Sequence, residues 1–252
     1  MNMFDLTGKK AIVVGGAGDL GKSMLEALVE AGAEAVVIGR GKRTGNVAYE
    51  LSKKGYKVSP VYAELTNRAQ VDRSFQEALD ILGGRVDILV NAAGIQRRHK
   101  SEEFPLSDWD EILEVNLTVT FRYCQLAAHN MIPNGGGKII NVASLISFFG
   151  GYTIPAYAAS KGGVAQLTKA LSNEWAGKGI NVNAIAPGYM DTKMNVALIN
   201  DPVRNSEIIA RIPQHRWGTG EDMKGATVFL ASNASNYVNG VILPVDGGYL
   251  GR

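Results

Sequence analysis

Cysteine is almost absent from this sequence, which holds Cys124 alone among 252 residues. A single thiol cannot form an internal disulfide bond, and such scarcity is typical of proteins of reducing compartments. Long apolar runs are missing too, because no stretch approaches the roughly 20 residues that a membrane-spanning helix needs. Residues 1–10 lack the apolar core of a secretory signal. We therefore expect a cytoplasmic protein without a membrane partner.

An excess of charge of one sign is also missing. Lysine and arginine total 26 and the acidic residues total 24, which gives a formal net charge of +2. That balance offers no electrostatic case for binding nucleic acid. The histidines show no metal-ligand spacing, and we assign no metal; they are His99, His129 and His215. With 46% apolar residues, the composition is typical of a globular protein with a large core.

Short β-branched runs alternate with helical patterns along almost the whole chain. Strands are expected at Lys10–Gly15, Ala35–Ile38, Lys57–Val61, Val86–Asn91, Gly137–Val142, Asn181–Ile185 and Val241–Pro244. Helices are expected at Leu20–Ala31, Ala69–Leu82, Asp108–Asn130, Tyr157–Trp175 and Glu221–Ala231. The strands are apolar without alternation, which indicates helices on both faces of a parallel sheet. The sequence predicts an α/β, three-layer, doubly wound Rossmann-type fold in one domain, residues 1–252.

One segment breaks this rhythm. From Pro187 to about Pro213 the sequence is long, polar and weakly patterned. A loop of that length inside a compact domain is commonly a lid or a binding loop. We expect a substrate loop at about 188–213, of which residues 191–211 close over the substrate.

A glycine-rich turn follows the first expected strand. Gly16-x-Gly18-x-x-Gly21 fits the dinucleotide fingerprint, in which glycines let a helix amino terminus approach a pyrophosphate. The second strand usually ends in an acid that binds the ribose of NAD, but here it ends in Gly39-Arg40, followed by Lys42 and Arg43. A guanidinium pairs well with the extra phosphate of NADP. The sequence therefore favours NADP over NAD, with a solvated basic loop as the alternative.

Candidate catalytic groups lie further along the chain. Tyr157 and Lys161 are spaced one helical turn apart, so that they share a helix face. A nearby ammonium lowers the pKa of a phenol and makes it a better base. Ser144 directly follows the fifth expected strand, where such sheets gather their sites, and could bind the substrate oxygen.

These features resemble the short-chain dehydrogenase/reductase family from about Phe4 to the carboxyl terminus. The matching motifs are Asn91-Ala92-Ala93-Gly94, Asn116 within Glu-Val-Asn-Leu, Ser144, Tyr157-x-x-x-Lys161 and Pro187-Gly188. The resemblance implies an NAD(P)-dependent enzyme that acts on CH–OH groups, a sheet order of 3-2-1-4-5-6-7 and a homotetramer or homodimer, of which we expect the homotetramer.

The resemblance also implies roles for residues. Tyr157 would be the general acid/base, Lys161 would lower its pKa and hold the nicotinamide ribose, Ser144 would orient the substrate oxygen, and Asn116 would fix a relay water. The implied cofactor site comprises Gly15, Gly18, Asp19, Leu20, Gly21, Arg40, Glu64, Leu65, Asn91, Ala92, Gly94, Tyr157, Lys161, Pro187, Gly188 and Thr192.

Three positions depart from the family pattern. Val14 replaces a threonine, Asp19 occupies a glycine position, and Ala92 replaces an asparagine. An aspartate beside a pyrophosphate would repel it, so we expect the Asp19 side chain to point away, toward the helix amino terminus.

Residues 94–98 and 211–218 resemble sugar-acid dehydrogenases of the family. Gln96 and Arg98 follow the fourth strand, and with Ser144 and Tyr157 they are the expected substrate residues, since an arginine can bind a carboxylate bidentately. A solvated basic stretch at 97–100 is the alternative. Phe148 and Phe149 are candidates for an apolar pocket wall, and Arg216 and Trp217 for packing or subunit contacts.

Other functions stay open. A 3-oxoacyl carrier-protein reductase could use residues 97–100 to dock an acidic carrier. The spacing Gly15-x-x-Gly18-x-x-Gly21 suggests an epimerase or dehydratase, although those enzymes generally carry a further substrate domain. A non-catalytic dinucleotide-sensing module is the alternative of another class.

Overall fold

A seven-stranded parallel sheet runs through the computed structural model, which describes residues 2–252. The strand order is β3-β2-β1-β4-β5-β6-β7, as the family resemblance implied. The strands are β1 (Lys10–Val14), β2 (Glu34–Gly39), β3 (Val58–Tyr62), β4 (Ile88–Asn91), β5 (Gly137–Val142), β6 (Ile180–Pro187) and β7 (Ile242–Val245). Every strand that the sequence predicted is present, and the predicted Rossmann-type fold is confirmed.

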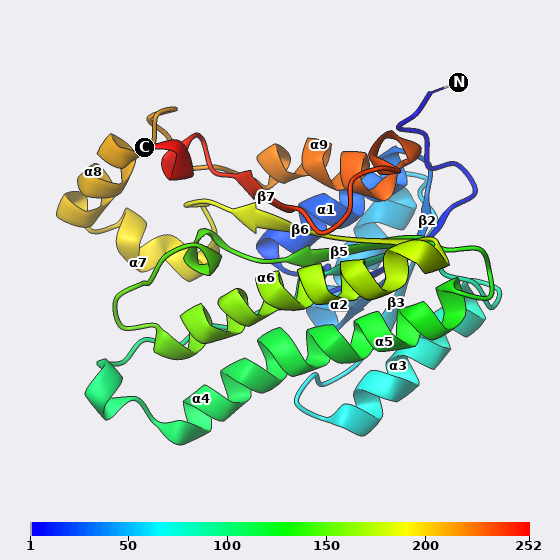
Figure 1. Cartoon of the computed structure of the whole chain (residues 1–252), viewed down its shortest axis with the longest axis horizontal. Coiled ribbons are helices and arrows are strands. Elements are labelled where there is room, and N and C mark those ends of the chain that lie inside the picture. The colour runs from blue at the N-terminus through cyan, green and yellow to red at the C-terminus, as the bar shows by residue number, and fades with distance from the viewer. Residues whose placement is uncertain (1) are drawn as a thin grey trace.

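Helices cover both faces of the sheet (Figure 1). One layer packs α1 (Asp19–Glu30), α2 (Gly41–Lys53) and α9 (Gly220–Ala231) on the sheet. The opposite layer consists of α3 (Arg68–Ile81), α5 (Val119–Met131) and α6 (Pro155–Trp175), with α4 (Leu106–Leu113) leading into α5. Alternate residues of β1 explain why both layers form: Ala11 and Val13 belong to the first core cluster, and Ile12 and Val14 to the second.

Three expectations from the sequence need correction. No helix was predicted over α2, whose glycines weaken the helical signal. The helix expected at Asp108–Asn130 is interrupted by a π turn at Glu114–Thr118. The expected loop at 188–213 contains the helices α7 (Val196–Ile199) and α8 (Pro202–Arg211). Asp201 caps α8 by accepting from the amides of Val203 and Arg204, which is why helix forms in this polar segment.

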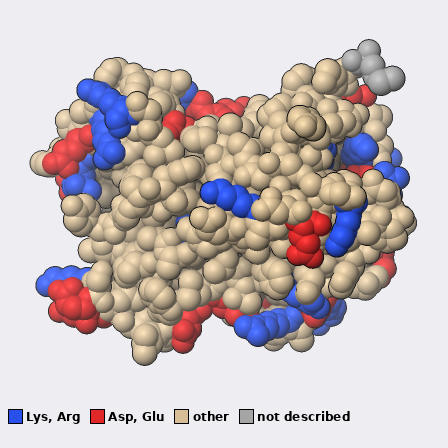
Figure 2. All heavy atoms as spheres, in the orientation of Figure 1, with Lys and Arg blue, Asp and Glu red and all other residues tan. Residues whose placement is uncertain are grey.

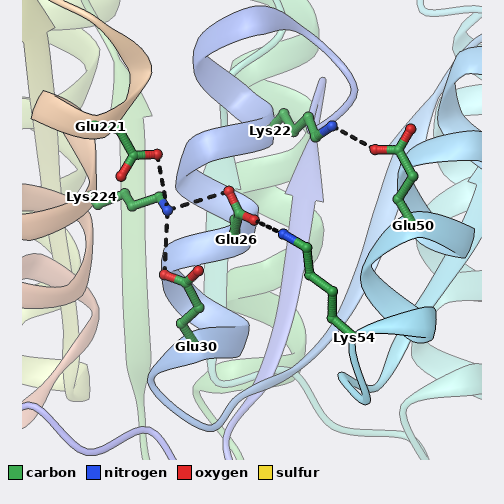
Figure 3. A network of polar contacts seen from close by, with 7 residues as sticks. All are labelled: Lys22, Glu26, Glu30, Glu50, Lys54, Glu221 and Lys224. Carbon is green, nitrogen blue, oxygen red and sulfur yellow. Dashed lines mark hydrogen bonds and ion pairs between the residues drawn. The ribbon is translucent and has the colours of Figure 1, made fainter.

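An ion-pair network joins α1, α2 and α9 on the outer surface (Figure 3). The Lys224 ammonium lies 3.3 Å from Glu26, 3.4 Å from Glu30 and 3.0 Å from Glu221. Glu26 also pairs with Lys54 at 2.6 Å. The hydrogen bond from Lys54, together with Lys224, holds the pKa of Glu26 below its usual value, against the effect of burial. The network therefore stabilises the fold at neutral pH, and this stabilisation is lost as the pH falls through that lowered pKa.

Lys224→Met is expected to lower the free energy of unfolding by about 1–2 kcal/mol, because three carboxylates would lose their shared cation. Urea denaturation at low and high salt measures the effect, which should shrink at high salt. Lys178→Met is the matched control, since Lys178 makes one exposed contact of 4.0 Å with Glu174. Equal effects of the two substitutions would show that the network contributes nothing beyond a surface pair.

The surface agrees with the balanced composition. On the face that Figure 2 shows, charged side chains of both signs are scattered among wide uncharged areas. Within residues 2–252, no helix has the length and hydropathy that crossing a membrane requires.

Candidate active site

The candidate site lies at the carboxyl ends of the strands, where α7 and α8 project from the sheet (Figure 1). A cavity of about 710 Å³ opens there. It combines predicted residues with residues from the segment after β6. Its walls include Gln96, Arg98, Ser144, Phe149, Tyr152, Tyr157, Tyr189, Met194, Leu198, Arg204, Arg211 and Tyr249. All four predicted substrate residues thus share one cavity. Phe149 contributes to its wall, whereas Phe148 is not among the lining residues.

Close packing of the glycine-rich turn requires glycine at two positions. A Cβ on Gly15, whose φ is +76°, would lie 2.5 Å from the amide nitrogen of Ala93. A Cβ on Gly21 would lie 2.3 Å from the carbonyl oxygen of Gly15. Gly18 precedes α1 and, among the described residues, no side chain caps that helix. The first amides of α1 are therefore available to phosphate oxygens, as the fingerprint requires.

Asp19 is the first residue of α1, yet its carboxylate is directed away from the turn. It accepts a hydrogen bond of 2.6 Å from the Arg43 guanidinium and one of 2.8 Å from the amide of Lys193. Burial by itself raises the pKa of Asp19, but these two hydrogen bonds lower it, so the carboxylate stays ionised. The expected turning away is observed, although the contacts are made to α2 and to the segment after β6.

The end of β2 is positively charged. Arg40 precedes α2, and its side chain is 74% exposed, 3.8 Å from Glu64. In the described chain, the first turn of α2 has no acidic residue and no side-chain cap. Lys42 and Arg43 lie within this turn, so cations and free helical amides gather at one point. Such a point suits a phosphate better than a ribose diol.

Tyr157 and Ser144 meet at the cavity. Ser144 precedes a short 3₁₀ turn (Leu145–Ser147), and its Oγ accepts from the amide of Ile146 at 3.2 Å, which leaves its hydroxyl proton to donate to Tyr157. Burial raises the pKa of Tyr157, and a hydrogen bond with Ser144 lowers it, with a net rise. In this state the phenol is protonated at neutral pH and suits the donation of a proton to a carbonyl oxygen.

Lys161 lies one turn after Tyr157 on α6. Its Nζ is 5.8 Å from the centre of the Tyr157 ring and donates a hydrogen bond of 2.6 Å to the carbonyl oxygen of Val142. Burial lowers the pKa of Lys161 to about 8. A Cβ on Gly94 would lie 3.6 Å from this Nζ, so the ammonium faces the loop after β4. Tyr157 and Lys161 lie on the same face of α6, as their spacing predicted. A lowering of the Tyr157 pKa by Lys161 stays a prediction, since burial and the hydrogen bond with Ser144 set the direction observed here.

Asn116 is fully buried in the π turn and braces the site. Its Oδ1 accepts from the amide of Ile95 at 2.8 Å, and its Nδ2 donates to the Ile95 carbonyl and to Ser160, each at 3.0 Å. Both amide protons are used, so the side chain ties the loop after β4 to α6. A part for Asn116 in a water relay stays a prediction.

Neighbouring side chains of the basic stretch after β4 point in different directions. Arg97 pairs with Glu111 at 3.2 Å, and His99 with Asp108 at 2.7 Å, both on α4. Arg98 lies between them and lines the cavity. No carboxylate of residues 2–252 lies within ion-pair distance of Arg98. Burial lowers the pKa of its guanidinium, so an anion in the cavity would be bound favourably. Arg98 is therefore available to a ligand, while its neighbours are not.

The other predicted cofactor residues lie at the start of α1 or at and after the carboxyl ends of strands. Leu20 and Ala92 pack against the first core cluster, and Leu65 against the second. Asn91 is buried and donates to Asn141 at 2.9 Å, which holds β4 to β5. Pro187 ends β6, and a Cβ on Gly188 would lie 2.6 Å from Asp246. Thr192 directly precedes the 3₁₀ turn Lys193–Asn195.

Several residues of the candidate site escaped the sequence reasoning. Ser147 accepts from the Ser144 amide at 3.3 Å and donates to the Lys161 carbonyl at 2.7 Å, so it joins two predicted catalytic residues. Its Ser-x-x-Ser spacing from Ser144 resembles a capping box and could have revealed it. Arg204 and Arg211 reach the cavity from α8, where weak patterning gave no signal. Arg216 and Trp217 contact Asp222 and Asn205, which agrees with the packing role expected for them.

A dinucleotide-dependent oxidoreductase is defined by three features together, which are the doubly wound sheet, the glycine turn and the pair Tyr157 and Lys161. Residues 9–202 match the family model described as short chain dehydrogenase. The chain belongs to the short-chain dehydrogenase family.

Relatives extend over the whole chain. It is 44% identical to 2-dehydro-3-deoxy-D-gluconate 5-dehydrogenase of Bacillus subtilis (strain 168), over 99% of this chain and 97% of the relative. A solved structure from Agrobacterium tumefaciens, provisionally assigned as a 2-deoxy-D-gluconate 3-dehydrogenase with bound NADP, is 47% identical, with full coverage of both chains and a TM-score of 0.93. A gluconate 5-dehydrogenase from Burkholderia cenocepacia J2315, in complex with NADP and tartrate, is 38% identical, covering 100% of this chain and 98% of that one, with a TM-score of 0.95. The predicted resemblance to sugar-acid dehydrogenases of the family is confirmed.

Proposed function

We propose that this protein is an NADP-preferring oxidoreductase that interconverts a secondary alcohol and a ketone in a sugar acid of the 2-deoxygluconate or ketodeoxygluconate type. The observation that carries the substrate class is Arg98, a guanidinium without a carboxylate partner among the described residues, placed in the same cavity as Ser144 and Tyr157. The names of the relatives point to the same class of substrate.

The roles of the side chains follow from their positions. When bound, the nicotinamide supplies the acceptor or the donor of the hydride. Ser144 orients the reacting oxygen through its hydroxyl group, and Tyr157 transfers the proton to or from that oxygen. Lys161 places a positive charge near Tyr157 and beside Gly94, where the nicotinamide ribose would lie. Residues 188–213 form the substrate segment, and Gln96 and Arg98 hold the polar end of the substrate.

The alternatives are less well supported. Docking of an acidic carrier needs a free basic stretch at 97–100, but Arg97 and His99 already pair with Glu111 and Asp108. A sensing module without turnover would not need Ser144, Tyr157 and Lys161 to lie close together.

A spectrophotometric assay tests the proposal directly. Purified protein would be offered NAD(H) and NADP(H) with sugar acids, their keto forms, neutral polyols and a 3-oxoacyl thioester. We expect turnover of sugar acids with NADP(H). Turnover of the thioester alone would replace the substrate assignment, and nucleotide binding without any turnover would favour the sensor.

Arg40→Ala is expected to raise the KM for NADP(H) about tenfold or more and to leave that for NAD(H) unchanged, since a charge-assisted hydrogen bond contributes about 1.5–3 kcal/mol. The steady-state KM for both nucleotides measures this. Lys53→Ala is the control, because it removes a charge from the opposite end of α2. A parallel rise for both nucleotides would mean that Arg40 does not select the phosphate.

We further propose a homotetramer that resides in the cytoplasm. Exposed apolar side chains on α4 and α5, such as Leu106 and Phe121, support association between copies. The lone, buried Cys124 supports a reducing compartment. Light scattering coupled to size-exclusion chromatography would determine the mass, and a monomeric mass would exclude the tetramer.

A further inference from the structure

Asp19 connects three parts of the molecule that are distant in sequence. It belongs to the nucleotide-binding turn, and one carboxylate oxygen accepts from Arg43 at the start of α2, 2.6 Å away. The other oxygen accepts from the backbone amide of Lys193, 2.8 Å away and 174 positions along the chain. A glycine, which the family pattern has at this position, could make neither contact.

The contact to Lys193 holds a part of the chain that has few other polar contacts. Within the described residues, no other hydrogen bond or ion pair joins residues 192–204 to the chain outside 190–211. The same short stretch supplies Met194, Asn195 and Leu198 to the wall of the substrate cavity. Its position therefore affects the shape of that cavity, and the Asp19 carboxylate is its one polar anchor on the nucleotide side.

Charge explains how an acid can stand beside a phosphate site. Arg43 neutralises Asp19, and the carboxylate is directed toward α2 and Lys193. Arg43 is consequently engaged, whereas Arg40 makes only a distant contact of 3.8 Å. Arg43 is therefore the counter-ion of Asp19, and the more weakly paired Arg40 is the residue proposed to bind the phosphate.

We propose that Asp19 is a positioning residue for the substrate, which fastens the turn Lys193–Asn195 to the nucleotide-binding turn and thereby sets the affinity for the sugar acid. The inference rests on the proposed function only for the choice of that substrate. Because Asp19 does not touch the cavity, its removal should act on substrate binding and not on the proton transfer at Tyr157.

Three variants test this proposal. Asp19→Ala removes the acceptor, Asp19→Asn keeps an acceptor for the Lys193 amide, and Arg43→Ala removes the counter-ion but leaves that acceptor in place. Hydrogen–deuterium exchange of residues 190–200, measured without substrate, reports the bond itself. We expect exchange at Lys193 to accelerate about tenfold in Asp19→Ala and to remain near that of the unmodified protein in the other two.

Kinetics provides the second readout. In Asp19→Ala the KM for the sugar acid should rise about tenfold while kcat stays within about threefold and NADP binding does not weaken, and Asp19→Asn should restore most of the KM. Unchanged exchange at Lys193, or a loss confined to kcat, would overturn the proposal. If the unmodified protein turns over no sugar acid, the proposed substrate is wrong, while the exchange experiment still decides whether the anchor exists.

Discussion

Tyr157→Phe is expected to lower kcat by at least about a thousandfold while the dissociation constant for NADP stays within about twofold. General acid/base catalysis by a positioned side chain contributes roughly 10²–10⁴-fold, and the phenol is the acidic hydroxyl that Ser144 contacts in the cavity. The substitution removes one oxygen from a side chain that faces the cavity, so the fold should be preserved. Steady-state kinetics and nucleotide titration measure the two quantities.

Tyr152→Phe is the matched control, because Tyr152 also lines the cavity but lies at its exposed rim. Its kcat should remain within about twofold of that of the unmodified protein. If Tyr157→Phe kept more than a tenth of the normal turnover, the proton would have to come from another group and the assignment of Tyr157 would fail.

Arg98→Met should raise the KM for a sugar acid about a hundredfold, with a much smaller effect on a neutral polyol of similar length. The guanidinium is partly desolvated and has no carboxylate partner within the described chain, so a substrate carboxylate would form a strong charge-assisted pair with it. Methionine keeps much of the length and apolar stem of arginine but not its charge. The KM increase for the sugar acid, divided by that for the neutral polyol, measures the contribution of the substrate carboxylate to binding.

Arg97→Met separates this role from general basicity. Arg97 is the adjacent residue and is paired with Glu111, so its loss should change the KM by less than about threefold. Similar losses in the two variants would mean that the stretch acts through its overall charge. The Arg98 assignment would also fail if acid and polyol were affected equally.

Much of the fold and of the convergence of residues at the candidate site could be predicted because the signals are local. Continuous apolar runs such as Ile88-Leu89-Val90 identify strands buried on both faces. The glycine turn follows β1 directly, and the spacing of Tyr157 and Lys161 fixes a shared helix face before any tertiary contact is known.

The parts that could not be predicted depend on distant contacts or on weak local patterns. The apolar residues Val47, Ala48 and Leu51 of α2 have helical spacing, but Gly41 and Gly45 obscure it. The bond between Asp19 and Lys193 joins residues whose proximity only the folded sheet creates. The arginines of α8 lie on a short amphipathic helix inside a polar segment, and the spacing of its apolar residues does not reveal that this helix meets the cavity.

The π turn at Glu114–Thr118 separates two tasks along one rod of helix. A widened turn shifts the helical phase of the residues after it by about one position, roughly 100° of rotation. Before it, Asp108 and Glu111 face the loop that presents Arg98; after it, Tyr123 and Ala127 face the sheet. The change of phase therefore lets one continuous run of helix serve the loop after β4 with its first half and the sheet with its second half.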